Sequence, residues 1–321
     1  MVKDATYTNG VIAVKEKYLL KDKIFKMCEG GAEEALRALT DSGFGRGTEI
    51  ASVYEYEKLV AADEEAIDGF IREYAPARAE AEYLLAPRDF HNAKALVKAH
   101  FTGLDADKLL APEGLIPVSH ILQCIEEGKY DGLGKILGGA VKEAADAFSK
   151  DGGASGAEIG NIFEKALYSH LFNACARNPL LKRLIAVKAD MTNILTALRS
   201  VDRQYALNSF VSGGKLSNET LLKLLNDDRE RAAHSLDNTP YAEFVKKCFA
   251  DRSEGLPLTE AERLCENYEI QYFSAKKYDL IKNQPFLYYV FRRRAENANV
   301  RILFVCLLAG MRDSEIKKRL R

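Results

Sequence analysis

The chain has 321 residues, of which 47% are hydrophobic, and its formal net charge is −1. This length and composition suffice for a large buried core, and the balanced charge excludes a general attraction to nucleic acid or to membrane lipids. The longest apolar run, 302–309, is far shorter than the ~20 residues of a membrane-spanning helix. We therefore expect no transmembrane segment of the chain's own, and the polar start MVKDATYTNG predicts no signal peptide.

From the N-terminal third onwards, apolar residues recur at the spacing of an α-helix. One stripe begins at Tyr56 and ends at Tyr74, a second follows from Phe163 to Cys175, and a third from Met191 to Val201. We find no alternating pattern that is typical of a β-strand. The sequence thus predicts an all-α fold, with breaks in the stretches 43–47, 103–117, 150–156, 212–217 and 253–257.

Three segments share an acid-x-x-Asn pattern: PRDFHNAKAL (87–96), KADMTNILTALR (188–199) and RAENANVRIL (294–303). The pattern consists of Asp89 with Asn92, Asp190 with Asn193, and Glu296 with Asn299, so the acids are 101 and 106 residues apart. A proline lies eleven to thirteen residues before each acid, and proline favours the first turn of a helix. Each motif is therefore expected about three turns into a helix, although Pro87 predicts that Asp89 instead begins a new one.

A second half-unit also recurs, at 22–39, 119–137 and 218–236, and a truncated copy lies at 313–320. The opening half-unit precedes any acid-x-x-Asn segment, and the last acid-x-x-Asn segment has only the truncated copy after it. We expect the opening half-unit to complete that last module. The order predicts three pseudo-symmetric helical modules, at approximately 51–150, 151–255, and 256–321 together with 1–50.

Asp89, His91 and Asn92 could together form an acid–base site, which is the enzyme hypothesis. The repeats favour another interpretation, because the positions of His91 are taken by Thr192 and Ala298 in the other copies. In this structural interpretation, the acid and the asparagine lie one turn apart on one helix face and bond to a neighbouring segment.

Motifs of nucleotide, hydrolase and metal sites are absent from the sequence. No Gly-Lys pair is followed by Ser or Thr as in a phosphate-binding loop, and there is no H-E-x-x-H or G-x-S-x-G. The six cysteines form no C-x-x-C pair and are expected as buried residues of a reducing compartment. We therefore expect no catalytic residue, no cofactor and no metal.

The C-terminal part is basic, with twelve Lys and Arg against four Asp and Glu between residues 276 and 321. A basic surface of this kind predicts an acidic partner. The candidate interface residues are Arg292, Arg293, Arg294, Lys317, Lys318 and Arg319.

In their order and spacing, these motifs resemble the C subunit of the V-type (A/V-type) ATP synthase, whose counterpart in eukaryotic V-ATPases is the d subunit. The resemblance covers the whole chain. It is carried by RDFHNAKAL and ADMTNILTALR, by GGKLSNETLLKLL (213–225), and by Tyr7-x-Asn9 followed by Glu16-x-x-Leu19-Leu20. Two departures are Glu296 in place of Asp, and Lys15 as the first basic residue after Asn9.

The resemblance implies a funnel of three helical modules without catalytic residues. It implies a peripheral protein at the cytoplasmic face of the membrane, and a central-rotor subunit that couples the proteolipid ring to the stalk subunits D and F during proton or sodium transport. The alternative is a generic helical-repeat adaptor that binds protein or RNA along a groove. An RNA groove needs exposed aromatics among basic residues, whereas most Tyr and Phe here fit the apolar stripes.

Overall fold

A computed structural model of the chain describes residues 4–20, 22–150, 153–200, 202–225, 231, 234, 236–253, 259–274 and 282–320. Helices account for all of its regular secondary structure, and no strand occurs in these ranges, so the all-α prediction is confirmed. Parts of the predicted breaks 150–156 and 253–257, and of the predicted half-unit 218–236, lie outside the described residues. The chain divides into two compact units, of which unit 1 comprises 1–77 and 266–321 and unit 2 comprises 78–265.

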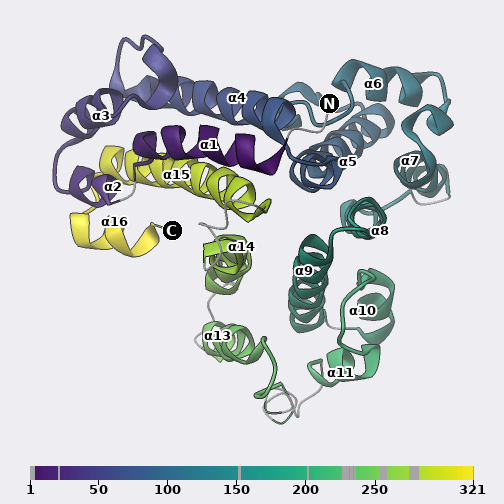
Figure 1. The fold of residues 1–321 in the computed structure, drawn as a ribbon. Coiled ribbons are helices and arrows are strands. Elements are labelled where there is room, and N and C mark those ends of the chain that lie inside the picture. The colour runs from purple at the N-terminus through teal and green to yellow at the C-terminus, as the bar shows by residue number, and fades with distance from the viewer. Residues whose placement is uncertain are drawn as a thin grey trace. The chain divides into compact units, whose positions relative to one another are not determined.

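Unit 1 contains both ends of the chain. Its helices are α1 (Ala5–Lys15), α2 (Lys23–Met27), α3 (Ala32–Asp41), α4 (Tyr56–Tyr74), α15 (Gln284–Leu308) and α16 (Asp313–Arg319), with short 3-10 turns η1 (Glu16–Tyr18), η2 (Phe44–Gly47) and η3 (Val53–Glu55). Helices α1 and α4 both pack along α15 (Figure 1).

The core of unit 1 joins the start of the chain to its end. Leu20, Ile24 and Leu39 belong to the same buried cluster as Leu303 and Phe304 of α15. The long helix α15 therefore has the opening half-unit as one of its packing partners, and each buried side chain of this size stabilises the unit by about 1.5–3 kcal/mol.

Unit 2 contains α5 (Arg78–Thr102), α6 (Val118–Glu126), α7 (Lys135–Phe148), α8 (Gly156–Ala174), α9 (Pro179–Arg199), α10 (Arg203–Ser209), α11 (Asn218–Lys223) and α13 (Ala242–Ser253), with η4 (Asp107–Leu109) and η5 (Tyr130–Leu133). Helix α14 (Thr259–Ser274) begins in this unit and ends in unit 1. Helix α5 packs against α6, α7 and α8, and α9 packs against α8, α10, α11 and α13.

Each acid-x-x-Asn motif lies in the interior of a long helix. Asp89 and Asp190 are eleven residues after the first residue of α5 and α9, and Glu296 is twelve residues after that of α15. Helix α9 begins as its sequence predicts, because Asn178 accepts a hydrogen bond from the Leu181 amide at 3.1 Å and Pro179 occupies the first turn.

Pro87 does not start a new helix, so that prediction is wrong. Helix α5 continues through Pro87 from Arg78 to Thr102. An interior proline removes one backbone hydrogen bond and costs about 3 kcal/mol. The buried side chains on both sides of it, including Leu85 at 0% exposure and Phe90 at 3%, offset this cost because they pack only when the helix is continuous.

Candidate functional site

The first acid-x-x-Asn pair holds the loop between α5 and α6. The two carboxylate oxygens of Asp89 accept hydrogen bonds from the backbone amides of Leu115 and Ile116, both at 3.0 Å. The side chain of Asn92 donates to the carbonyl of Ala111 at 3.1 Å and accepts from the amide of the same residue at 2.8 Å. Four hydrogen bonds thus fix the segment that leads into α6.

The second pair repeats this arrangement between α9 and α11. Asp190 accepts hydrogen bonds from the amides of Lys215 and Leu216, both at 2.9 Å. Asn193 donates to the carbonyl of Val211 at 2.9 Å and accepts from its amide at 2.8 Å. Asp190 also accepts a short hydrogen bond from the hydroxyl of Tyr241, which has no counterpart among the contacts of Asp89. We call each such arrangement a loop clamp.

Both loop clamps need a glycine that the sequence analysis missed. Gly114 and Gly214 each precede the first amide that the carboxylate binds. A Cβ atom on Gly114 would lie 2.2 Å from an oxygen of Asp89, and one on Gly214 would lie 2.1 Å from an oxygen of Asp190. The backbone therefore approaches the carboxylate too closely for any side chain. The sequence does contain a signal for these two glycines, because each one follows the acid of its motif by about 25 residues.

The third pair, on α15, has an arginine beside its acid. Glu296 and Asn299 are buried on α15, at 3% and 5% exposure. Glu296 accepts a hydrogen bond from the guanidinium of Arg293 at 3.4 Å, and the same guanidinium forms a close ion pair with Asp63 of α4. Arg293 also donates to the carbonyl of Tyr18 at 3.1 Å, which ties α15 to the segment before α2.

Arg293 is therefore buried, whereas the sequence placed it on an exposed basic surface. Its side chain is 9% exposed, because it compensates the buried carboxylates of Asp63 and Glu296. Arg292, Arg294 and Lys317 are partly buried, and Lys318 and Arg319 are exposed. Lys317 pairs with Glu29 at 2.8 Å.

The electrostatics of the clamp fit a binding role for the carboxylate rather than a catalytic one. Burial raises the pKa of Asp89, and the amides of Ile116 and Leu115 partly offset this rise. Both oxygens already accept hydrogen bonds from the loop. His91 is exposed, and its ring lies 2.8 Å from the carbonyl of Leu109 in the same loop. The expected trio of Asp89, His91 and Asn92 thus contacts three places along one backbone segment.

A metal centre is not formed by the residues that the structure describes, since these contain no group of three or more His, Cys, Asp or Glu side chains arranged to hold an ion. All six cysteines are free, and five of them are buried. Burial raises the pKa of the Cys175 thiol to about 12, so it remains protonated and unreactive at neutral pH.

Comparison with known proteins assigns the family. A family model described as the ATP synthase (C/AC39) subunit matches residues 8–319. The chain belongs to this family. It is also 22% identical, over 276 residues, to the C subunit of the V-type sodium ATPase of Enterococcus hirae, an alignment that covers 83% of this chain and 82% of that protein.

As a member of the C/AC39 family, the chain is a subunit of a rotary, ion-transporting V-type ATPase and is not itself an enzyme. The enzyme hypothesis for Asp89, His91 and Asn92 is therefore wrong. In the described ranges, none of the helices is long and apolar enough to span a membrane.

Proposed function

We propose that this C/AC39 chain is the central-rotor subunit that couples the proteolipid ring of the membrane sector to the central stalk subunits D and F. In this role it lies peripherally at the cytoplasmic face and transmits torque during proton or sodium transport. It contributes no catalytic residue and no cofactor. The family match along nearly the whole chain is the observation that carries the proposal.

The internal repeat supports this role physically. A part that transmits torque must be stiff, and the loop clamps connect α5 and α9 to the segments that follow them through four buried or partly buried hydrogen bonds each. We propose that Asp89, Asn92, Asp190, Asn193, Glu296 and Asn299 are structural signatures of three modules, at about 51–150, 151–255, and 256–321 with 1–50. Three such modules around one axis form a funnel with two different faces.

The basic residues suit the contact with the partners. Arg292, Arg294, Lys317, Lys318 and Arg319 remain interface candidates, and attraction of exposed charges to an acidic surface weakens as the ionic strength rises. Figure 1 shows α15 and α16, which carry these residues.

Co-purification from detergent-solubilised membranes tests the proposal. An affinity-tagged chain is expected to retain both the proteolipid ring and subunits D and F. Recovery of the chain without ring or stalk would contradict the rotor role, and recovery with an unrelated protein or RNA would favour the helical-repeat adaptor.

A further inference from the structure

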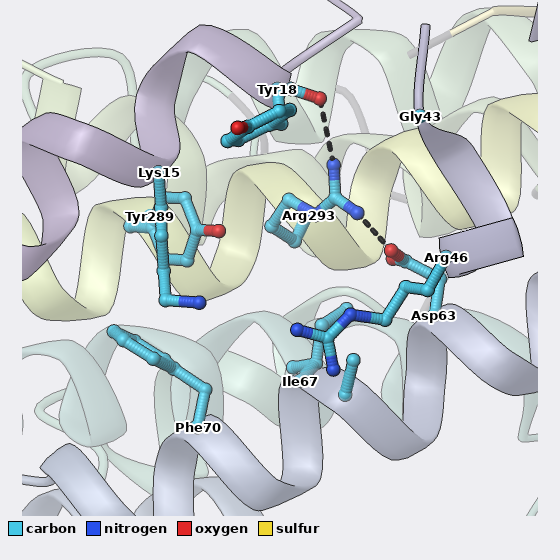
Figure 2. A pocket seen from close by; sticks show the side chains of 10 residues that line it. Lys15, Tyr18, Gly43, Arg46, Asp63, Ile67, Phe70, Tyr289 and Arg293 are labelled. Carbon is cyan, nitrogen blue, oxygen red and sulfur yellow. Dashed lines mark hydrogen bonds and ion pairs between the residues drawn. The ribbon is translucent and has the colours of Figure 1, made fainter. Parts of the chain in front are cut away.

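Unit 1 contains a pocket that the loop clamps do not use. It has a volume of about 310 Å³ and lies between α1, η1, η2, α4 and α15 (Figure 2). Lys15, Arg46, Tyr289 and Arg293 form its polar wall, and Phe70 lies on its apolar side. A pocket of this size is at the small end of the range for ligand sites, so it accommodates one polar group with a few carbon atoms.

Two cations of the pocket form no ion pair. Arg293 is already paired with the carboxylates of Asp63 and Glu296. By contrast, the side chains of Lys15 and Arg46 form no ion pair or hydrogen bond within the part of the chain that the structure describes. The amine of Lys15 lies 5.7 Å from the centre of the Phe70 ring. Among the residues that line this pocket, basic side chains therefore outnumber acidic ones, while Glu65 and Glu73 lie with Lys15 and Arg46 in the adjoining hollow.

The backbone holds Arg46 in an unusual conformation. With φ at 55°, it is the only non-glycine residue with positive φ among the described residues. Left-handed backbone is unfavourable for a residue with a side chain, and such strain is concentrated at functional sites. Gly45 keeps the turn against α4, since a Cβ atom there would lie 2.7 Å from the Leu59 side chain. The turn Phe44–Gly47 thus places a strained arginine at the pocket.

The donors converge from three elements. Figure 2 shows the amine of Lys15 and the guanidinium of Arg46 on opposite sides of the pocket, with the Tyr289 hydroxyl directed into the space near them. Burial raises the pKa of Tyr289 to about 12, so its hydroxyl stays protonated and can donate a hydrogen bond. The negative charge of Asp63 repels a bound anion only weakly, because Asp63 forms an ion pair with Arg293.

We propose that this pocket is an oxyanion site that binds one carboxylate or phosphate group, with Arg46, Lys15 and Tyr289 as its ligands. The planar fork of an arginine matches both groups through two parallel hydrogen bonds. The carbon atoms of the bound molecule pack on Phe70. The anion is either a free small ion or an acidic side chain of a protein partner, and the site does not depend on the rotor role proposed above.

The first arm of the test uses free anions. The melting temperature of the purified chain is measured against sodium phosphate and sodium acetate, with sodium chloride at equal ionic strength as the reference. Arg46→Gln removes the fork, and Lys15→Gln removes the second charge from a regular helix, in case the strained turn fails to fold. Arg37→Gln, on the exposed face of α3 in the same unit, is the matched control.

The second arm compares the same variants in co-purification from membranes. Loss of a hydrogen bond to a charged group weakens binding about ten- to a hundredfold. Anion-induced stabilisation that Arg46→Gln and Lys15→Gln abolish, and Arg37→Gln keeps, identifies a free anion. Absence of that effect, with about tenfold lower recovery of partner proteins by the pocket variants alone, identifies a partner carboxylate.

The inference is overturned if the pocket variants match Arg37→Gln in both arms. If the unaltered chain does not co-purify with ring or stalk, the rotor role fails and the anion arm alone decides this site.

Discussion

On α15 the acid of the acid-x-x-Asn pair has an arginine beside it, whereas the acids on α5 and α9 form no ion pair with the described residues. Asp89 and Asp190 accept hydrogen bonds from neutral backbone amides of the loop that follows their own helix. Glu296 lies beside Arg293, which also compensates Asp63 from a different helix. A buried carboxylate can thus be stabilised by fixed dipoles or by an opposite charge, and the second solution makes several side chains depend on one arginine.

The largest expected effect is at this arginine. Arg293→Met leaves the carboxylate of Asp63, which is 2% exposed, without its counter-charge. We expect the free energy of unfolding to fall by about 3–5 kcal/mol, as for a buried ion pair that loses one partner. Urea denaturation followed by circular dichroism measures the change.

Arg301→Met is the matched control, because it is on the same helix and also pairs with α4, through Glu57 and Glu64, but is 39% exposed. The free energy of unfolding should fall by about 1 kcal/mol or less in this control. Equal losses for the two variants would show that Arg293 does not compensate a buried charge.

The next effect is at the second loop clamp. Asp190→Asn keeps the shape of the side chain but replaces an acceptor oxygen with an amide that faces another N–H donor. We expect urea denaturation to show a free energy of unfolding that is lower by about 2–4 kcal/mol, because two backbone amides and the Tyr241 hydroxyl donate hydrogen bonds to this carboxylate. Asp202→Asn, at the exposed start of α10, is the control and should cost less than about 1 kcal/mol. Equal decreases in the free energy of unfolding for Asp190→Asn and Asp202→Asn would show that the loop clamp adds no stability beyond that of an exposed helix cap.

The first loop clamp should be weaker. Asp89→Asn is expected to cost about 1–3 kcal/mol, since this carboxylate binds two amides and has no tyrosine. His91→Ala, on the same turn but exposed, should change stability by less than about 0.5 kcal/mol. A larger loss from His91→Ala than from Asp89→Asn would contradict the order of importance that we infer from the repeats.

The smallest expected effect is a pH dependence in unit 2. A hydrogen bond from His170, at 2.9 Å, lowers the pKa of Glu82 below 4.5. The contribution of Glu82 is therefore fully present above about pH 4.5 and is lost as the pH falls through the lower pKa of the folded state. Burial raises the pKa of Asp89 above 3.8, so its contribution has the opposite sign: it is present below pH 3.8 and is lost as the pH rises through the folded-state value.

Thermal melts between pH 3 and pH 6 check this difference. Glu82→Gln should make the decline in melting temperature toward acid shallower, and Asp89→Asn should make it steeper. A shift in the same direction for both variants would mean that the two carboxylates do not differ in the way that their surroundings indicate.

The sequence predicted the features that depend on local pattern. The apolar stripes located α4, α8 and α9, and Pro179 and Pro285 marked helix starts, because periodicity and first-turn preferences act within a few residues. The spacing of the acid-x-x-Asn pairs also located Asp89 and Asp190, which the structure places in equivalent hydrogen-bond networks.

Contacts between distant segments could not be predicted in this way. Arg293 was assigned to a basic surface, since nothing near it in the sequence reveals Asp63, which lies 230 residues away. Pro87 was expected to interrupt the helix so that Asp89 begins a new one. This prediction failed because the burial that stabilises α5 around Pro87 comes from tertiary packing. The shared spacing of Gly114 and Gly214 from their acids is visible in the sequence, but the close approach of backbone to carboxylate that explains it is visible only in the structure.

Amide hydrogen exchange tests the central claim most directly, namely that each loop clamp holds the loop of its own module. Exchange is measured at Leu115 and Ile116 and at Lys215 and Leu216, in the unaltered chain and in Asp89→Asn and Asp190→Asn. We predict that Asp89→Asn accelerates exchange at the first pair of amides alone, and that Asp190→Asn accelerates it at the second pair alone. Unchanged exchange at both pairs, or equal acceleration at both in either variant, would contradict this account.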